Sequence, residues 1–89
     1  MRRLLVRERV VPADRKDNYR AAWRDVLNAA ITAGVNAWIF QSAASDDRFI
    51  EFVEWKGVSV APPGDVNNAL DALEMIAPAL AAGSWKEWK

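Results

Sequence analysis

The amino-acid sequence predicts an α+β domain, in which a four-stranded antiparallel sheet carries two helices on one of its faces. Residues 37–55 contain two runs rich in aromatic and β-branched residues around a polar break at residues 43–47, a pattern typical of a β-hairpin. Two other segments repeat apolar residues every three or four positions and therefore predict amphipathic helices. The resulting order, strand-helix-strand-strand-helix-strand, is that of a ferredoxin-like plait, and the 89 residues leave room for one such domain, residues 1–89.

The first strand is predicted over residues 4–11, where apolar residues fall on both faces, and Pro12 ends it. A helix follows, with Asp14 as its expected N-cap and Gly34 as its left-handed end. The apolar positions at helical spacing give this helix one face directed to the core, formed by Tyr19, Ala22, Trp23, Val26, Leu27, Ala30 and Ile31.

The two hairpin strands are predicted over residues 35–42 and 48–55. Both again carry apolar residues on each face, which indicates a sheet that is covered on both sides. After the hairpin, residues 58–64 are expected to form an irregular connection, with a short edge strand at residues 58–60 as the alternative.

The second helix is expected to begin after Asp65 as its N-cap and to repeat apolar residues up to Leu80. Pro78 lies inside this pattern and should kink the last turn or end the helix early. Gly83 is expected to close the segment, and residues 84–89 alternate well enough to predict a terminal strand.

In this topology the first and third strands are central, antiparallel neighbours, so Arg7 and Arg9 are expected to lie opposite Glu51, within reach of ion pairing. The net charge is zero, yet residues 1–34 carry eight Lys or Arg and four Asp or Glu, whereas residues 35–89 carry four and eight. Packing of one half on the other explains this asymmetry. The basic residues lack a clustered stripe, which argues against a nucleic-acid partner.

Both helices must cover one face of the sheet, and nothing in the chain remains to cover the other. In the preferred register that second face carries Leu5, Trp38, Phe40, Val53 and Trp55. With 52% apolar residues and five tryptophans, so short a chain would leave much apolar surface in water. The sequence therefore predicts a homodimer that pairs these faces, in which Trp85 and Trp88 anchor the last strand against the partner.

The residue types argue against several kinds of chemistry. The sequence has no histidine and no cysteine, so the commonest general base, the thiolate nucleophile and the usual zinc ligands are missing. Asp46 and Asp47 are interpreted as solvated turn residues, and the four isolated glycines form no phosphate-binding loop. No apolar run approaches the roughly 20 residues of a membrane span. We expect a cytoplasmic protein with no metal, no cofactor and no membrane partner.

The hairpin also resembles that of a known superfamily. Phe40-Gln41-Ser42, Asp46-Asp47-Arg48-Phe49 and Glu51-Phe52-Val53-Glu54-Trp55-Lys56 are similar to the hairpin of the dimeric α/β-barrel superfamily, and most of all to its antibiotic-biosynthesis-monooxygenase-like branch. The resemblance implies two plaits joined face to face, with a pocket between each sheet and its helices or inside the barrel. The activities it implies are cofactor-independent oxygenation of polyphenols, haem degradation, and isomerisation or decarboxylation of small aromatic molecules.

Haem degradation fits this sequence poorly. Trp55 stands where the haem-degrading members have a tryptophan, but those members also use a histidine on the second helix, and this sequence has none. On the first strand, Arg7 and Glu8 stand where those members have an asparagine.

The resemblance to the oxygenases implies Asn, Trp, Tyr and Arg side chains that hold a substrate which itself reacts with oxygen. The candidate catalytic residues are Glu8 and Arg48. The candidate ligand-binding residues are Tyr19, Asn36, Trp38, Phe40 and Trp55. Two of these, Trp38 and Trp55, have the alternative role of packing in the dimer interface.

Glu8 is a candidate because it interrupts an apolar set on the first strand, where burial would favour its protonated form and suit it to proton transfer. The alternative is a salt bridge to Arg20 or Arg24 of the first helix.

The expected function is that of a small homodimer that binds a small apolar or aromatic molecule, as a cofactor-independent monooxygenase or isomerase. The alternative function is a non-catalytic structural or protein-interaction module.

Overall fold

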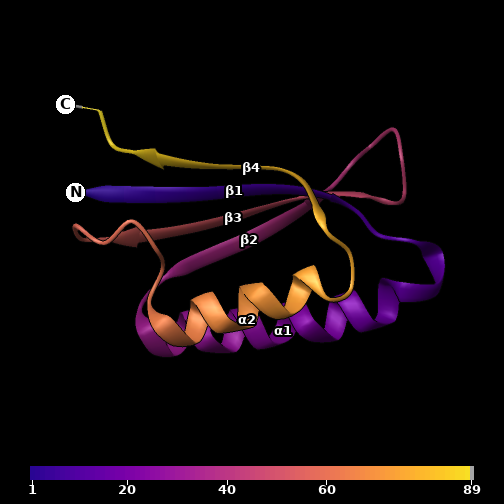
Figure 1. Cartoon of the computed structure of the whole chain (residues 1–89), viewed down its shortest axis with the longest axis horizontal. Helices are drawn as coiled ribbons and strands as arrows, with labels where there is room; N and C mark the ends of the chain where they lie inside the picture. Colours follow the sequence, from indigo (N-terminus) through magenta and orange to yellow (C-terminus); the bar gives the residue numbers. More distant parts are fainter. Residues whose placement is uncertain (89) are drawn as a thin grey trace.

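The computed structural model describes residues 1–88 and has the predicted α+β fold (Figure 1). Its elements are β1 (Arg2–Val10), the 3₁₀ turn η1 (Ala13–Arg15), α1 (Lys16–Ala33), β2 (Asn36–Gln41), β3 (Arg48–Lys56), α2 (Gly64–Glu74) and β4 (Ala79–Lys86). The strands form one antiparallel sheet in the order β2-β3-β1-β4. Figure 1 shows α1 and α2 side by side against one face of this sheet, so the other face is left open.

The register between β1 and β3 decides which side chains face the helices. Leu5 lies opposite Val53, and Arg7 lies opposite Glu51, which confirms that these two strands are central antiparallel neighbours. Because paired residues share a face and side chains alternate along a strand, the odd-numbered residues of both strands point toward the helices.

This register corrects the predicted composition of the open face. Leu5, Val53 and Trp55 pack in the core with the helices, and only Trp38 and Phe40 of the five predicted residues lie on the open side. The open face was predicted wrongly because Glu51 places a charged residue on the same face of β3 as Val53 and Trp55. The structure neutralises that carboxylate inside the core, so a face that contains a charge is nevertheless the buried one.

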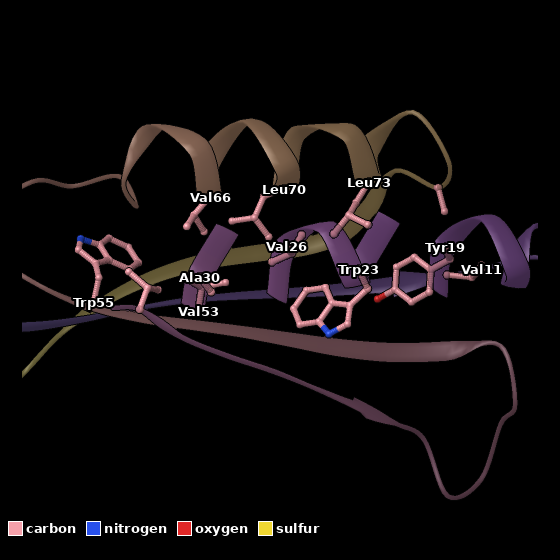
Figure 2. Close-up of a cluster of buried hydrophobic side chains, with 12 residues drawn as sticks. Val11, Tyr19, Trp23, Val26, Ala30, Val53, Trp55, Val66, Leu70 and Leu73 are labelled. Carbon is pink, nitrogen blue, oxygen red and sulfur yellow. The ribbon is translucent and has the colours of Figure 1, made fainter. Parts of the chain in front are cut away.

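The core lies between the sheet and the two helices (Figure 2). Its fully buried aliphatic side chains are Val11, Val26, Val53, Val66, Leu70 and Leu73. Each contributes roughly 1.5–3 kcal/mol relative to an exposed position. Figure 2 shows Trp55 and Tyr19 at opposite ends of this core.

The prediction for α1 is confirmed at the C-terminal end of the helix and is wrong at its N-terminal end. Gly34 has φ 69°, and its N–H donates to the carbonyl of Ile31 at 3.3 Å, which confirms the left-handed C-terminal end. The expected N-cap is wrong: Asp14 lies within η1, and no side chain caps α1, which begins at Lys16. The tight turn after Pro12 replaces the cap, because the Arg15 N–H donates to the Pro12 carbonyl at 2.9 Å.

The C-terminal third differs most from the prediction. Helix α2 ends at Glu74, although the apolar repeat runs on to Leu80, which confirms that Pro78 ends the helix early. Strand β4 begins at Ala79, directly after Pro78. Proline lacks an N–H donor and disfavours a helical residue before it, so the apolar repeat could not continue as a helix. The Glu74 carboxylate then accepts the Ala79 N–H at 3.0 Å and joins the end of α2 to the start of β4.

Two smaller expectations, for Gly83 and Asp65, are corrected in the same region. Gly83 lies within β4 opposite Val6 and ends no helix, and Asp65 lies in the first turn of α2 while Pro63 occupies the N-cap position. The irregular connection after the hairpin is confirmed, since residues 58–63 form neither helix nor strand and the alternative edge strand at residues 58–60 is absent. Of the strand predicted at residues 84–89, residues 84–86 belong to β4, and residue 89 lies outside the described part of the chain.

A buried ion pair links the sheet to both helices. Arg9 is 0% exposed and Glu51 is 1% exposed. The Arg9 guanidinium donates to both carboxylate oxygens of Glu51, from Nε at 2.7 Å and from Nη2 at 3.0 Å. The same guanidinium donates to Glu74 of α2 at 3.1 Å and to the Ala77 carbonyl at 2.6 Å, and the Tyr19 hydroxyl of α1 donates to Glu51 at 2.5 Å. One charged centre therefore connects β1, β3, α1 and α2.

The predicted pairing of two arginines with Glu51 is confirmed for Arg9 alone. Although burial disfavours its charged form, the hydrogen bonds to Glu51 keep the pKa of Arg9 above its ordinary value. Arg7 lies opposite Glu51 in the register, but its guanidinium approaches Glu74 instead, at 3.7 Å. Glu51 thus pairs with Arg9, whereas Glu74 is approached by both arginines.

We predict that Glu51→Gln lowers the free energy of unfolding by about 3 kcal/mol or more, because the substitution leaves the buried Arg9 without its main counter-charge. Urea unfolding followed by tryptophan fluorescence measures the loss. The control Asp17→Asn removes a carboxylate that is 98% exposed and should lower the urea midpoint far less. The double variant Arg9→Met/Glu51→Leu should recover part of the stability, since it leaves neither charge unpaired. A Glu51→Gln variant as stable as the wild type would contradict this view of the core.

We also predict that stability falls above pH 10 and that Tyr19 causes part of the fall. Burial, and then the hydrogen bond to Glu51, raise the pKa of Tyr19 well above its ordinary value of about 10. The unfolded phenol ionises near pH 10 while the folded one stays protonated, so the Tyr19 contribution is complete below pH 10 and is lost as the pH rises. Urea midpoints at pH 8 to 11 should decline less steeply for Tyr19→Phe than for the wild type; parallel curves would exclude the effect.

Candidate functional site

A cleft lies between α1 and the half of the sheet formed by β2 and β3. Its volume is ≈190 Å³, and it is lined by Lys16, Tyr19, Arg20, Trp23, Ile39, Gln41 and Phe49. The four helical residues are spaced by three and four positions, which places them on one face of α1. The strand residues are two positions apart on β2 or paired across to β3, so they share the face of the sheet that looks toward α1.

Aromatic side chains form the floor of this cleft. Tyr19 and Trp23 are 3% and 6% exposed, and the rings of Tyr19 and Phe49 lie 5.0 Å apart at an angle of 50°. Figure 2 shows Tyr19 and Trp23 between α1 and the sheet. A cavity of roughly 150 Å³ is large enough to hold benzene. This cleft therefore has the size and surface for a compact aromatic molecule.

The acid–base properties of the cleft follow from the buried network beneath it. The Tyr19 hydroxyl donates a hydrogen bond to Glu51, and burial together with this bond raises the pKa of Tyr19, so the phenol stays protonated. The phenol oxygen can therefore still accept a hydrogen bond from a ligand. Glu51 is itself held by both arms of Arg9. Among the described residues no carboxylate lines the cleft, so it offers hydrogen bonding and stacking rather than a paired acid and base.

The structure separates the seven predicted site residues into three places. Tyr19 alone lines the cleft. Trp55 lies at the far end of the core, where its indole N–H donates to the Ser59 carbonyl at 3.1 Å. The side-chain amide of Asn36 donates a hydrogen bond to the Glu54 carboxylate at 3.2 Å. Asn36 and Trp55 together line a groove of ≈390 Å³ at the end of α1. The other four residues lie on the open face of the sheet.

On the open face the aromatic candidates pack against one another. Trp38 stacks on Phe52 with ring centroids 5.4 Å apart, and Phe40 meets the same ring edge-on at 5.8 Å. Phe40 is nevertheless 56% exposed. These contacts form an aromatic surface that no element of the described chain covers.

The two candidate catalytic residues, Glu8 and Arg48, also lie on the open face. Their charged groups are 3.5 Å apart, both side chains are about half exposed, and they line a shallow hollow of ≈330 Å³. Both earlier interpretations of Glu8 are corrected: it is not buried, and it does not pair with Arg20 or Arg24. The reason is the strand alternation, which directs even-numbered residues of β1 away from the helices.

Six residues that line the cleft were not selected from the sequence. The helical ones share the spacing of Tyr19, but a core face has the same spacing, and Trp23 was for that reason assigned to the core. Gln41 offered a weak signal as the polar residue that follows the apolar residues 37–40. Only the packing of α1 over β2 shows that these residues leave a cleft.

The described residues place limits on other kinds of site. Nowhere in residues 1–88 do three His, Cys, Asp or Glu side chains come close enough together to hold a metal ion. Neither helix in this part of the chain is long and apolar enough to cross a membrane.

Comparison with known proteins gives matches in structure alone. No protein-family model and no curated protein sequence matches this chain. Among solved structures, a variant of SnoaB, a cofactor-independent oxygenase from Streptomyces nogalater, superposes with a TM-score of 0.72 at 14% identity, covering 99% of this chain and 94% of that one. Rv0793 from Mycobacterium tuberculosis gives 0.74 at 10% identity, covering 100% and 97%. An antibiotic biosynthesis monooxygenase gives 0.65 at 9% identity, covering 96% and 94%. The chain therefore has the fold of the antibiotic-biosynthesis-monooxygenase-like proteins, as the resemblance of its hairpin indicated.

Proposed function

We propose that this protein is a homodimer that binds one compact aromatic molecule in the cleft of each protomer and acts on it as a cofactor-independent monooxygenase or isomerase. The observation that carries the proposal is the cleft itself, with its aromatic floor, its hydrogen-bonding phenol and its lack of a paired acid and base. The fold shared with SnoaB, described as a cofactor-independent oxygenase, supports the same class of chemistry.

The cleft residues have distinct roles in this proposal. Trp23 and Phe49 hold the ring of the ligand by stacking and edge contacts. The Tyr19 oxygen and the Gln41 amide orient a hydroxyl or carbonyl group on the ligand. In an oxygenation without metal or flavin the electrons must come from the substrate, so the protein contributes placement and exclusion of water.

The open face supports the homodimer. Its exposed or half-buried apolar side chains are Leu4, Val6, Trp38, Phe40, Ile50, Phe52 and Trp85. Such a contiguous surface is uncommon on a soluble monomer, and a second copy offers a surface of the same kind and shape. In such a dimer Glu8 and Arg48 would be polar groups at the barrel interface, which keeps them candidates for a site within the barrel.

The second candidate function is a non-catalytic interaction module. The stacking of Trp38 on Phe52 favours it, because an aromatic surface already packed in this way suits protein contacts as well as a ligand wall. In this alternative the open face forms the dimer and the cleft stays empty.

We predict that Phe40→Glu converts the dimer to a monomer, because it places a charge within the apolar contact. Phe40 lies on the edge strand β2, so the fold should tolerate the substitution. Sedimentation equilibrium at micromolar concentration measures the change. Ile31→Glu is the matched control. Ile31 was expected on the core face of the helix but is 78% exposed, so this variant should remain dimeric. A wild-type protein that is monomeric in dilute solution would refute the homodimer.

We further predict that the wild-type protein binds 2-naphthol and that Gln41→Trp weakens this binding at least tenfold by filling the mouth of the cleft. Ligand-observed NMR titration measures both affinities. Thr32→Trp introduces the same side chain at an exposed position of α1 outside the cleft and should leave the affinity unchanged. Equal binding by the Gln41→Trp variant would place the ligand elsewhere, and absence of binding would favour the interaction module.

A further inference from the structure

The mouth of the cleft carries an unbalanced positive charge. Of its lining residues, Lys16 and Arg20 are basic, and within residues 1–88 no acidic residue lines it. The two cations are four positions apart on α1 and therefore lie one turn apart on the same face, on either side of Tyr19. The chain as a whole has a net charge of zero, so this concentration of charge is local.

Neighbouring carboxylates do not cancel the two cations. Asp17 approaches Arg20 at 3.9 Å, but both side chains are largely exposed, and such a pair is weak in water. Glu51 lies below Tyr19, where both of its oxygens are held by Arg9. In the hairpin loop, the Asp47 carboxylate accepts the Ser45 hydroxyl. No carboxylate in the described part of the chain lies within ion-pair distance of Lys16.

Apart from the weak pair of Asp17 with Arg20, these two cations do not stabilise the helix. Like charges four residues apart on a helix repel each other. Basic residues in the first turn also oppose the helix dipole, whose positive end lies there, and Lys16 is the first residue of α1. An anion at the mouth of the cleft would relieve both repulsions at once.

We propose that the cleft selects an aromatic carboxylate, with the ring on the aromatic floor and the carboxylate between Lys16 and Arg20. The planar guanidinium of Arg20 can donate two parallel hydrogen bonds to a carboxylate, and the Lys16 ammonium adds a second positive charge. This inference rests on the proposed function only in placing the ligand in the cleft, and it adds the chemical class of the ligand.

The test compares two probes of the same ring system, 2-naphthoate, which is an anion at pH 7, and 2-naphthol, which is neutral there. Both are titrated into the 89-residue chain at low ionic strength and followed by ligand-observed NMR. We expect 2-naphthoate to bind at least tenfold more tightly than 2-naphthol. This preference should shrink as salt is added, because exposed charges are screened.

Substitutions then test whether Lys16 and Arg20 cause the preference for 2-naphthoate over 2-naphthol. Lys16→Gln/Arg20→Gln should lose the preference, so that it binds 2-naphthoate and 2-naphthol about equally. Continued binding of 2-naphthol by this variant reports that the cleft still accepts the ring. Arg24→Gln is the matched control, since Arg24 lies one turn further along α1, is exposed and does not line the cleft. A preference that survives in the double variant would overturn the inference.

The remaining outcomes separate this inference from the proposed function. Equal affinities for the two probes, both lost in Gln41→Trp, would overturn the anionic selectivity and leave an aromatic-binding cleft. Absence of binding by either probe at millimolar concentration would overturn both proposals.

Discussion

The buried pair of Arg9 and Glu51 is the constraint on which the rest of the structure depends. A guanidinium and a carboxylate can be removed from water together only if each finds nearly all of its hydrogen bonds in the interior. Here the partners come from four elements: the two central strands, Tyr19 of α1, and Glu74 and Ala77 at the end of α2. A shift of one residue between the strands would turn the pair outward, so the network specifies the register of the sheet as well as the position of both helices.

The same network determines the chemistry of the cleft. Tyr19 is held by its bond to Glu51 and kept protonated, so it presents a fixed oxygen rather than a mobile acid. Glu51 is occupied by Arg9 and takes no part as a base. With no histidine or cysteine in the chain, a reaction at this site would depend on the reactivity of the substrate and on how its ring is placed. The cations at the mouth, Lys16 and Arg20, would then distinguish one aromatic molecule from another.

The two faces of the sheet differ in composition and in what they can contact. The helix-covered face combines the buried ion pair with aliphatic residues and leaves a cleft where α1 spans β2. The open face is largely aromatic and aliphatic, with Trp38 stacked on Phe52 and the Glu8–Arg48 pair at one end. A homodimer formed through the open face would leave the cleft of each protomer accessible, so association and ligand binding would use separate surfaces.

The sequence by itself determined the order of the elements, the central pairing of the first and third strands, the Gly34 helix end and the ion pair of Arg9 with Glu51. Each of these depends on local periodicity or on residues that the topology makes neighbours. Only the tertiary structure decided which face of the sheet is buried. Trp55 and Val53 share a face with Glu51, and a strand pattern cannot reveal that Arg9 neutralises this carboxylate in the core. The cleft could not be predicted from the sequence either, because the helical residues that line it have the same spacing as any core-facing residues. A cavity arises only where packed surfaces fail to fill the space between them, and this depends on the tertiary structure.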